Sequence, residues 1–186
     1  VVKQSDLDWV YIFSALPLPG TQTLKDFIAM GAIDEKTFDF DYVRHGRRTF
    51  DTPEISAVDL ENLIYDTNVD YNFFGNKNFR DGLYEKAIDI WNQLILDKYP
   101  FHIVGRYCRA LAKRELGQVE EVELDFSECV KWVDLNGESK WMYERYKSKM
   151  PELEFHFQKL SLLQVFKLWS QYAKILNLSP HNWSVT

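Results

Sequence analysis

The chain has 186 residues and a formal net charge of −6, with 46% hydrophobic and 27% charged residues. This composition excludes disorder over the whole chain, and the length corresponds to about one domain. The acidic balance disfavours general binding to nucleic acids or anionic membranes, because both require an excess of Lys and Arg. Aromatic residues reach 16%, so many large side chains must pack between elements or at an interface.

Two cysteines, Cys108 and Cys129, are too few for a disulfide scaffold, which favours a reducing compartment. We therefore expect a cytoplasmic protein, with the nucleus as the alternative. The sequence has no zinc-like spacing of Cys and His, no phosphate-binding glycine loop and no recognisable set of nucleophile, base and acid. It predicts no metal, no cofactor and no catalytic activity. No apolar run approaches the roughly 20 residues of a membrane span.

The pattern divides the chain into three parts: an N-terminal extension over residues 1–55, a helical region over 56–150, and a long C-terminal helix with its tail over 151–186. The extension has mixed character. Within it, the segment from Ser5 through residue 13 is a candidate short helix capped by Ser5. A second candidate helix begins after a threonine at position 21 or 23 and stops at Gly31.

From Ser56 onward the apolar residues recur at helical spacing. The expected helices run from Ser56 to beyond Phe74, and then over residues 84–96, 103–116, 119–133, 141–149 and 151–178. Gly82 and Gly117 are expected to end helices with positive φ. Short helices joined by tight turns predict an all-α fold of antiparallel helix pairs.

Two segments of about 34 residues match when Gly75 is aligned with Ala110. The shared pattern places small residues where paired helices cross, at Gly75, Ala87 and Ala110, and large ones between pairs, at Trp91 and Phe126. The segments resemble the tetratricopeptide repeat. The run from Gly75 to Ile88 is similar to the first repeat of co-chaperone and immunophilin domains. The resemblance covers residues 65–150 and implies stacked helix pairs in a superhelix, closed by the long C-terminal capping helix.

The second and third repeats depart from this pattern. Arg106 and Arg109 stand where large apolar residues are usual, and Val122 replaces a small alanine. The third repeat, which begins near Trp141, is degenerate. An acidic run over residues 120–128 falls on the second helix of its pair and is expected to lie mostly on the outside.

The resemblance implies a concave groove that binds a peptide along the first helices of the pairs. The candidate groove residues are Asn72, Asn76, Phe79, Arg80, Tyr107, Leu111, Arg114 and Lys140. The alternative is an ordinary solvated helix face, on which Asn76 only hydrogen-bonds a backbone carbonyl. Many relatives bind the acidic tail of a heat-shock chaperone through five polar side chains, of which Asn76 and Lys140 remain here. Asn72, Cys108 and Glu144 replace the others, and Glu144 would repel a terminal carboxylate.

The last predicted helix has apolar residues over more than half of its circumference. Either the N-terminal extension folds back onto it, or it docks a partner or a second copy. Its candidate partner or dimer surface contains Phe166, Trp169 and Tyr172.

The resemblance favours a non-catalytic adaptor that binds a protein or peptide partner, with a heat-shock chaperone tail as one candidate despite the incomplete clamp. The alternative is the targeting or regulatory module of a larger enzyme, such as a peptidyl-prolyl isomerase of the FKBP or cyclophilin type.

Overall fold

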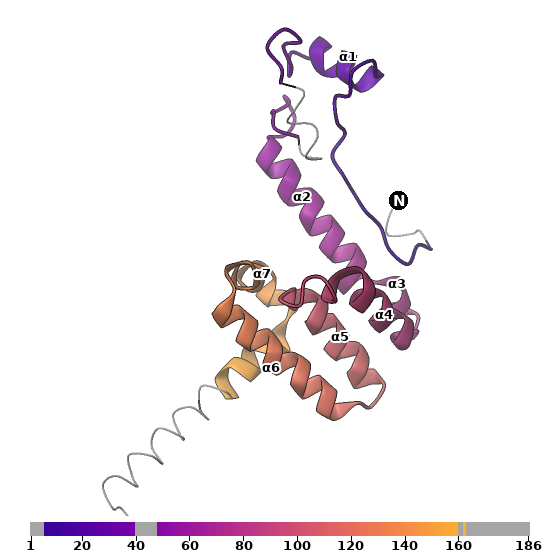
Figure 1. Cartoon of the computed structure of the whole chain (residues 1–186), viewed down its shortest axis with the longest axis vertical. Helices are drawn as coiled ribbons and strands as arrows, with labels where there is room; N and C mark the ends of the chain where they lie inside the picture. Colours follow the sequence, from indigo (N-terminus) through magenta and orange to yellow (C-terminus); the bar gives the residue numbers. More distant parts are fainter. Residues whose placement is uncertain (1–5, 40–47, 160–161, 163–186) are drawn as a thin grey trace, which may run out of the picture. The chain divides into compact units, whose positions relative to one another are not determined.

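A computed structural model describes residues 6–39, 48–159 and 162 of the chain. Every regular element in these ranges is a helix, which confirms the all-α class (Figure 1). The chain forms two compact units, Val1–Leu83 and Tyr84–Thr186. The division lies inside the predicted repeat region, between the two helices of the first predicted pair.

The first unit begins its helical part with α1 (Gln22–Ala29). The hydroxyl oxygen of Thr21 accepts a hydrogen bond from the Leu24 N–H at 3.3 Å and caps the helix. The chain leaves the helix through Gly31, which adopts a φ of +75°. Both boundaries agree with the sequence prediction. Leu24, Phe27 and Ile33 form a small hydrophobic core beside this helix.

The second helical stretch of this unit consists of α2 (Ala57–Val69), the π-helical turn η3 (Asp70–Phe74) and the short α3 (Lys77–Arg80). Ser56 caps α2 as predicted, because its hydroxyl oxygen accepts from the Asp59 N–H at 3.0 Å. A Cβ atom on Gly75 would lie 2.8 Å from the Asp70 carbonyl oxygen. The crowding at Gly75 therefore comes from the preceding π-helical turn, which includes Asp70, and not from a second helix.

The predicted short helix before residue 13 is wrong. The described part of this segment, residues 6–13, is extended and runs alongside α2 (Figure 1). Trp9, Tyr11 and Phe13 alternate with Val10 and Ile12, a period-two pattern of aromatic and β-branched residues that favours extended backbone. The N-cap preference of Ser5 is weaker than this alternation. The segment is therefore extended, and it makes its hydrogen bonds to a neighbouring helix.

The second unit contains α4 (Tyr84–Trp91), the π-helical η4 (Asn92–Leu96), α5 (Ile103–Glu115), α6 (Val119–Leu135), α7 (Gly137–Tyr146) and the short 3-10 helix η5 (Lys147–Lys149). Residues 151–159 are also helical. Helix α5 is central, because it packs against α4, α6 and α7, and α6 also packs against α7.

Turns and caps define the ends of these helices. Gly82 and Gly117 adopt φ values of +76° and +75°, as predicted. Gly117 closes the turn between α5 and α6. Helix α7 begins four residues before the predicted start at Trp141, because the Asn136 side-chain oxygen accepts from the Ser139 N–H at 2.9 Å.

The core of the second unit includes the small and large residues that the repeat pattern singled out. Trp91, Ala87 and Ala110 are fully buried, and Phe126 is nearly so. One member of the acidic run on α6 is also buried. The run lies mostly outside, as expected, and Asp125 is the exception because it is only 1% exposed.

Asp125 is surrounded by three cations of α5. Its carboxylate lies 3.5 Å from an Arg106 nitrogen and 3.0 Å from the Lys113 Nζ. The Arg109 guanidinium donates to the same carboxylate from two nitrogens, Nε at 2.9 Å and Nη2. This network accounts for Arg106 and Arg109 at positions where the repeat resemblance predicts large apolar residues: they neutralise and hydrogen-bond a carboxylate buried between two helices.

The start of α5 is expected to make the stability of the chain depend on pH. The Gly105 N–H donates to Nδ1 of His102 at 3.1 Å, so the neutral imidazole caps the helix. Burial lowers the pKa of His102 from 6.5 to about 4. The unfolded chain therefore binds a proton that the folded chain excludes between these pH values. This contribution is complete above pH 6.5 and is lost, by up to about 3 kcal/mol, as the pH falls toward 4.

Urea denaturation at a series of pH values checks this expectation. His102→Asn is the matched variant, because asparagine caps helices well and does not titrate. It should flatten the pH dependence between pH 4 and 6.5. Part of the dependence should remain, because burial also lowers the pKa of His156. An identical pH profile for the variant would show that His102 is not the titrating group.

Candidate peptide-binding site

Three asparagines lie four residues apart on the helical stretch of the first unit: Asn68 in α2, Asn72 in η3 and Asn76 at the start of α3. Residues at this spacing share one face of a helix. Four helical residues rise about 6 Å, nearly the length of two extended residues, about 6.6 Å. An asparagine row can therefore bind every second residue of an extended chain. We call these three residues the asparagine row.

The asparagine row binds the backbone of the chain's own extended segment. Asn72 accepts from the Val10 N–H at 2.8 Å and donates to the Val10 carbonyl at 2.7 Å. Asn68 repeats this with Ile12, at 2.9 Å for both bonds. Each amide thus pairs with one residue through two hydrogen bonds, as a neighbouring strand would.

The third member of the row completes the contact. The Asn76 amide donates to the Asp8 carbonyl at 3.4 Å and to the Asn72 carbonyl at 3.1 Å. Its oxygen accepts from the Phe79 N–H at 3.2 Å and so caps α3. The alternative that Asn76 binds backbone carbonyls is therefore correct, and one of those carbonyls belongs to the extended segment.

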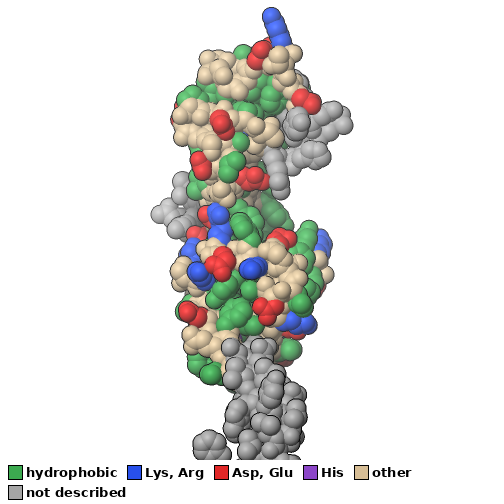
Figure 2. Space-filling view, turned by 90° about the vertical axis from the view of Figure 1, so that its left-hand side faces the viewer, with side chains coloured by type: hydrophobic (Ala, Val, Ile, Leu, Met, Phe, Trp, Pro, Cys, Tyr) green, Lys and Arg blue, Asp and Glu red, His purple; other side chains and the backbone are tan. Residues whose placement is uncertain are grey.

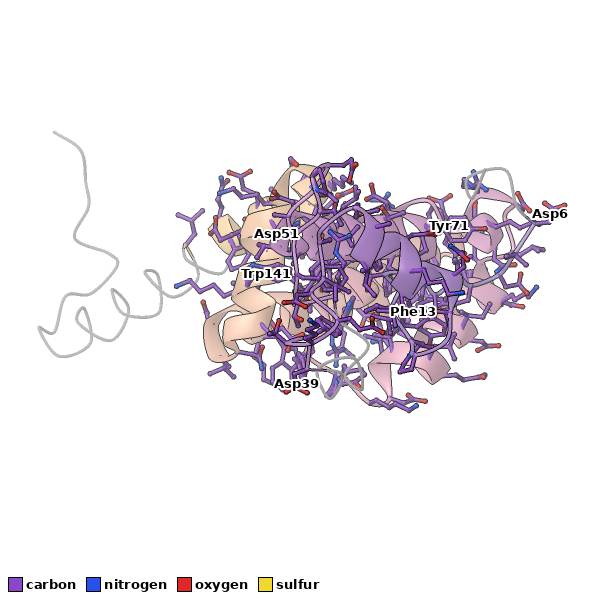
Figure 3. All side chains as sticks on the ribbon, turned by 90° about the horizontal axis from the view of Figure 1, so that it is seen from above. Asp6, Phe13, Asp39, Asp51, Tyr71 and Trp141 are labelled. Atoms are coloured by element: carbon purple, nitrogen blue, oxygen red, sulfur yellow. The ribbon has the colours of Figure 1, made fainter. Side chains whose placement is uncertain are left out.

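The segment runs antiparallel to the helix, since residues 8, 10 and 12 meet Asn76, Asn72 and Asn68 in that order. At the end near residue 8, the Tyr71 hydroxyl donates to the Leu7 carbonyl at 3.3 Å. Figure 3 labels Tyr71 of the helical stretch and Phe13 of the extended segment. Asn72 and Asn76 are 2% and 1% exposed, so neither is open to solvent as the groove prediction expected.

All of the bonds to the extended segment are made to its main-chain atoms. Each hydrogen bond of this type contributes roughly 1 kcal/mol to stability. Because the acceptors and donors are backbone groups, the arrangement holds an extended peptide with little dependence on its side chains. The amide groups carry no charge, so the row itself adds no attraction for an acidic ligand.

The predicted groove residues of the second unit are also bonded within the chain. The Tyr107 hydroxyl donates to the Glu152 carboxylate, and an Arg114 nitrogen lies 3.3 Å from its other oxygen. Burial acts to raise the pKa of Glu152, but the bonds from Tyr107 and Arg114 outweigh it and lower the pKa. Residues 151–159 thus contact the face on which a peptide was expected, and Tyr107 is buried there.

The remaining predicted groove residues are placed as follows. Leu111 in α5 and Phe79 in α3 are half-buried, whereas Arg80 in α3 and Lys140 in α7 are exposed. Cys108 is buried, and burial raises the pKa of its thiol, so it stays protonated.

Glu144, expected to repel an acidic ligand, pairs with Lys147 at 2.8 Å. This pair, together with the field of Lys140, lowers the pKa of Glu144. Its charge is therefore partly compensated, and the repulsion is weaker than the sequence alone indicates.

A groove of about 430 Å³ lies beside the Arg114–Glu152 pair. It is lined by Arg114, Val119, Val122, Glu123, Phe126, Glu152, Phe155 and His156. The His156 ring packs on the Phe126 ring with centroids 4.7 Å apart. Burial lowers the pKa of His156, which keeps the ring neutral against its aromatic neighbour. The floor is apolar, and the charged residues at its rim are of both signs.

Sequence reasoning missed Asn68 and the extended segment. The spacing of Asn68 from Asn72 was visible, since it repeats the interval between Asn72 and Asn76. The alternation of aromatic residues before Ser14 was the other available signal. The proposed partner surface at Phe166, Trp169 and Tyr172 lies outside the described residues.

Comparison of the chain with models of known families, with curated proteins and with solved structures gives no significant match. Within the described ranges, no helix combines the length and apolarity needed to cross a membrane. The same ranges hold no cluster of three or more His, Cys, Asp or Glu side chains suited to a metal ion. On the face drawn in Figure 2, basic and acidic side chains are interspersed, and neither forms a continuous patch.

Proposed function

We propose that this chain is a non-catalytic protein-interaction adaptor of the tetratricopeptide type, which binds an extended peptide along the first helices of its pairs. The packing of α5 against α4, α6 and α7 is compatible with stacked helix pairs. The positive φ values of Gly82 and Gly117 match the turns of such repeats. Two buried cysteines without a disulfide suit a cytoplasmic adaptor.

The asparagine row is the observation that carries this proposal. The resemblance placed the peptide-binding face at Asn72 and Asn76, and these two side chains bind an extended peptide, namely the chain's own residues 8–12. The segment acts as a ligand supplied in cis. It supports a mode of binding in which side-chain amides pair with the peptide backbone.

The hydrogen bonds of this face favour an extended ligand that is held through its backbone. Five of the six bonds described above for the segment involve an asparagine amide, and none involves a cation. An acidic chaperone tail requires several cationic donors. We therefore expect this face to bind an extended segment like residues 8–12 in preference to an acidic chaperone tail.

The test uses a full chain whose own segment is released. The double variant Val10→Pro/Ile12→Pro removes the two N–H groups that donate to Asn72 and Asn68. A fluorescent peptide with the sequence of residues 6–14 is then titrated and followed by anisotropy. The released chain should bind it about ten- to a hundredfold more tightly than the unmodified chain, because a tethered competitor acts at millimolar effective concentration.

Two controls sharpen the result. Tyr11→Pro removes an adjacent N–H that makes no bond to the row and should leave the tethered segment bound. Asn72→Ala in the released chain should weaken peptide binding by at least about tenfold, since it removes two hydrogen bonds. A folded, released chain that shows no binding, or binding unaffected by Asn72→Ala, would refute a peptide site on this face.

A further inference from the structure

The extended segment has a second edge, over residues 9–13, which faces away from the asparagine row. We propose that this edge pairs with the same edge of a second copy of the chain, in antiparallel orientation, to form a two-fold dimer. The inference goes beyond the proposed function, because it concerns the opposite side of the segment and does not require the row to bind a peptide from another molecule.

Hydrogen bonding supports the inference first. In extended backbone, the N–H and C=O of one residue point to the same side, and those of the next residue point to the other. The row uses both groups of Val10 and of Ile12. The corresponding groups of Trp9, Tyr11 and Phe13 therefore face the other edge, where no described residue hydrogen-bonds them.

The side chains support it next. Trp9, Tyr11 and Phe13 form a ladder on one face of the segment, with ring centroids 6.1 Å and 6.0 Å apart. Tyr11 is 61% exposed and Phe13 is 71% exposed. Trp9 is anchored, because its ring meets the Phe73 ring edge-on at 5.5 Å. An ordered edge with exposed aromatic residues and unpaired backbone groups is a template for another strand.

A second copy fits this edge because the segment is complementary to itself. Residues 9–13 contain no charge, no proline and no glycine, so no like charges oppose each other when two copies meet. Antiparallel pairing about Tyr11 places Tyr11 opposite Tyr11, and Trp9 of each copy opposite Phe13 of the other. Every cross-strand pair is then aromatic, and six backbone groups of each copy find partners.

The asparagine row makes such pairing possible. It fixes the segment along a helix before the second copy arrives, so the entropy of ordering residues 8–12 is already spent. The pair is isologous, as in most symmetric dimers. Since the contact is a single strand pair, we expect a weak dimer that forms in the micromolar range or above.

Sedimentation velocity of the full chain over a concentration series tests the proposal. The expected result is a shift from monomer to dimer with rising concentration. Tyr11→Lys should abolish the shift, because it places like charges opposite each other at the two-fold axis. Val58→Lys is the matched control. It changes an exposed apolar residue outside the segment, on α2, and should leave the shift unchanged.

Amide hydrogen exchange provides a second readout that a general loss of folding would not mimic. The N–H groups of Val10 and Ile12 should be protected at every concentration. Those of Trp9, Tyr11 and Phe13 should become protected only where the dimer forms. A chain that stays monomeric throughout, or a dimer that persists in Tyr11→Lys through another surface, would overturn the inference, whatever the released chain does with a peptide.

Discussion

Replacing Trp91 by alanine is expected to lower the free energy of unfolding by about 3–5 kcal/mol. The indole ring is fully buried at the end of α4, and α4 packs against α5. Removing the ring leaves a cavity that the surrounding helices cannot fill completely. Because α5 also packs against α6 and α7, the loss should extend along α4 to α7.

Urea denaturation followed by circular dichroism measures the effect of Trp91→Ala. Leu94→Ala is a suitable control, because Leu94 lies in the next turn and is 36% exposed. Leu94→Ala should lower the free energy of unfolding clearly less than Trp91→Ala does. If the two variants had the same unfolding midpoint as the unmodified chain, the position of Trp91 in the core would be wrong.

Replacing Asp125 by alanine is expected to cost a similar amount, about 3–5 kcal/mol. The carboxylate is buried, and it is the common partner of Arg106, Arg109 and Lys113. Without it, these cations face one another in a site shielded from water. Glu121 then pairs with Lys113 alone, at 2.8 Å, and cannot neutralise the two arginines.

Equilibrium unfolding of Asp125→Ala tests this expectation beside Asp134→Ala, which removes an exposed carboxylate from the same helix and should cost little. The difference should persist in high salt, since buried charges are screened weakly. Arg109→Met in the Asp125→Ala background should recover part of the loss, because it removes one uncompensated charge. Equal stability of Asp125→Ala and Asp134→Ala would show that the network is dispensable.

Local features of this protein follow from its sequence alone. Ser56 and Gly117 mark helix boundaries because a side-chain cap and a positive φ act within a few residues. Apolar spacing identified Trp91 as a core residue for the same reason, since burial on one helix face repeats along the sequence. These signals were sufficient for the all-α class and for most of the helix ends.

The binding partners of the polar side chains depend on the tertiary fold. Val10 and Asn72 lie 62 residues apart, and no local pattern pairs a particular amide with a particular backbone residue. The same holds for Asp125. Its position in an acidic run favours exposure, but in the fold it is buried against the cations Arg106 and Lys113 of α5. Burial of a polar group requires a partner of matching geometry. That partner comes from the folded arrangement of distant segments, which spacing along one helix does not encode.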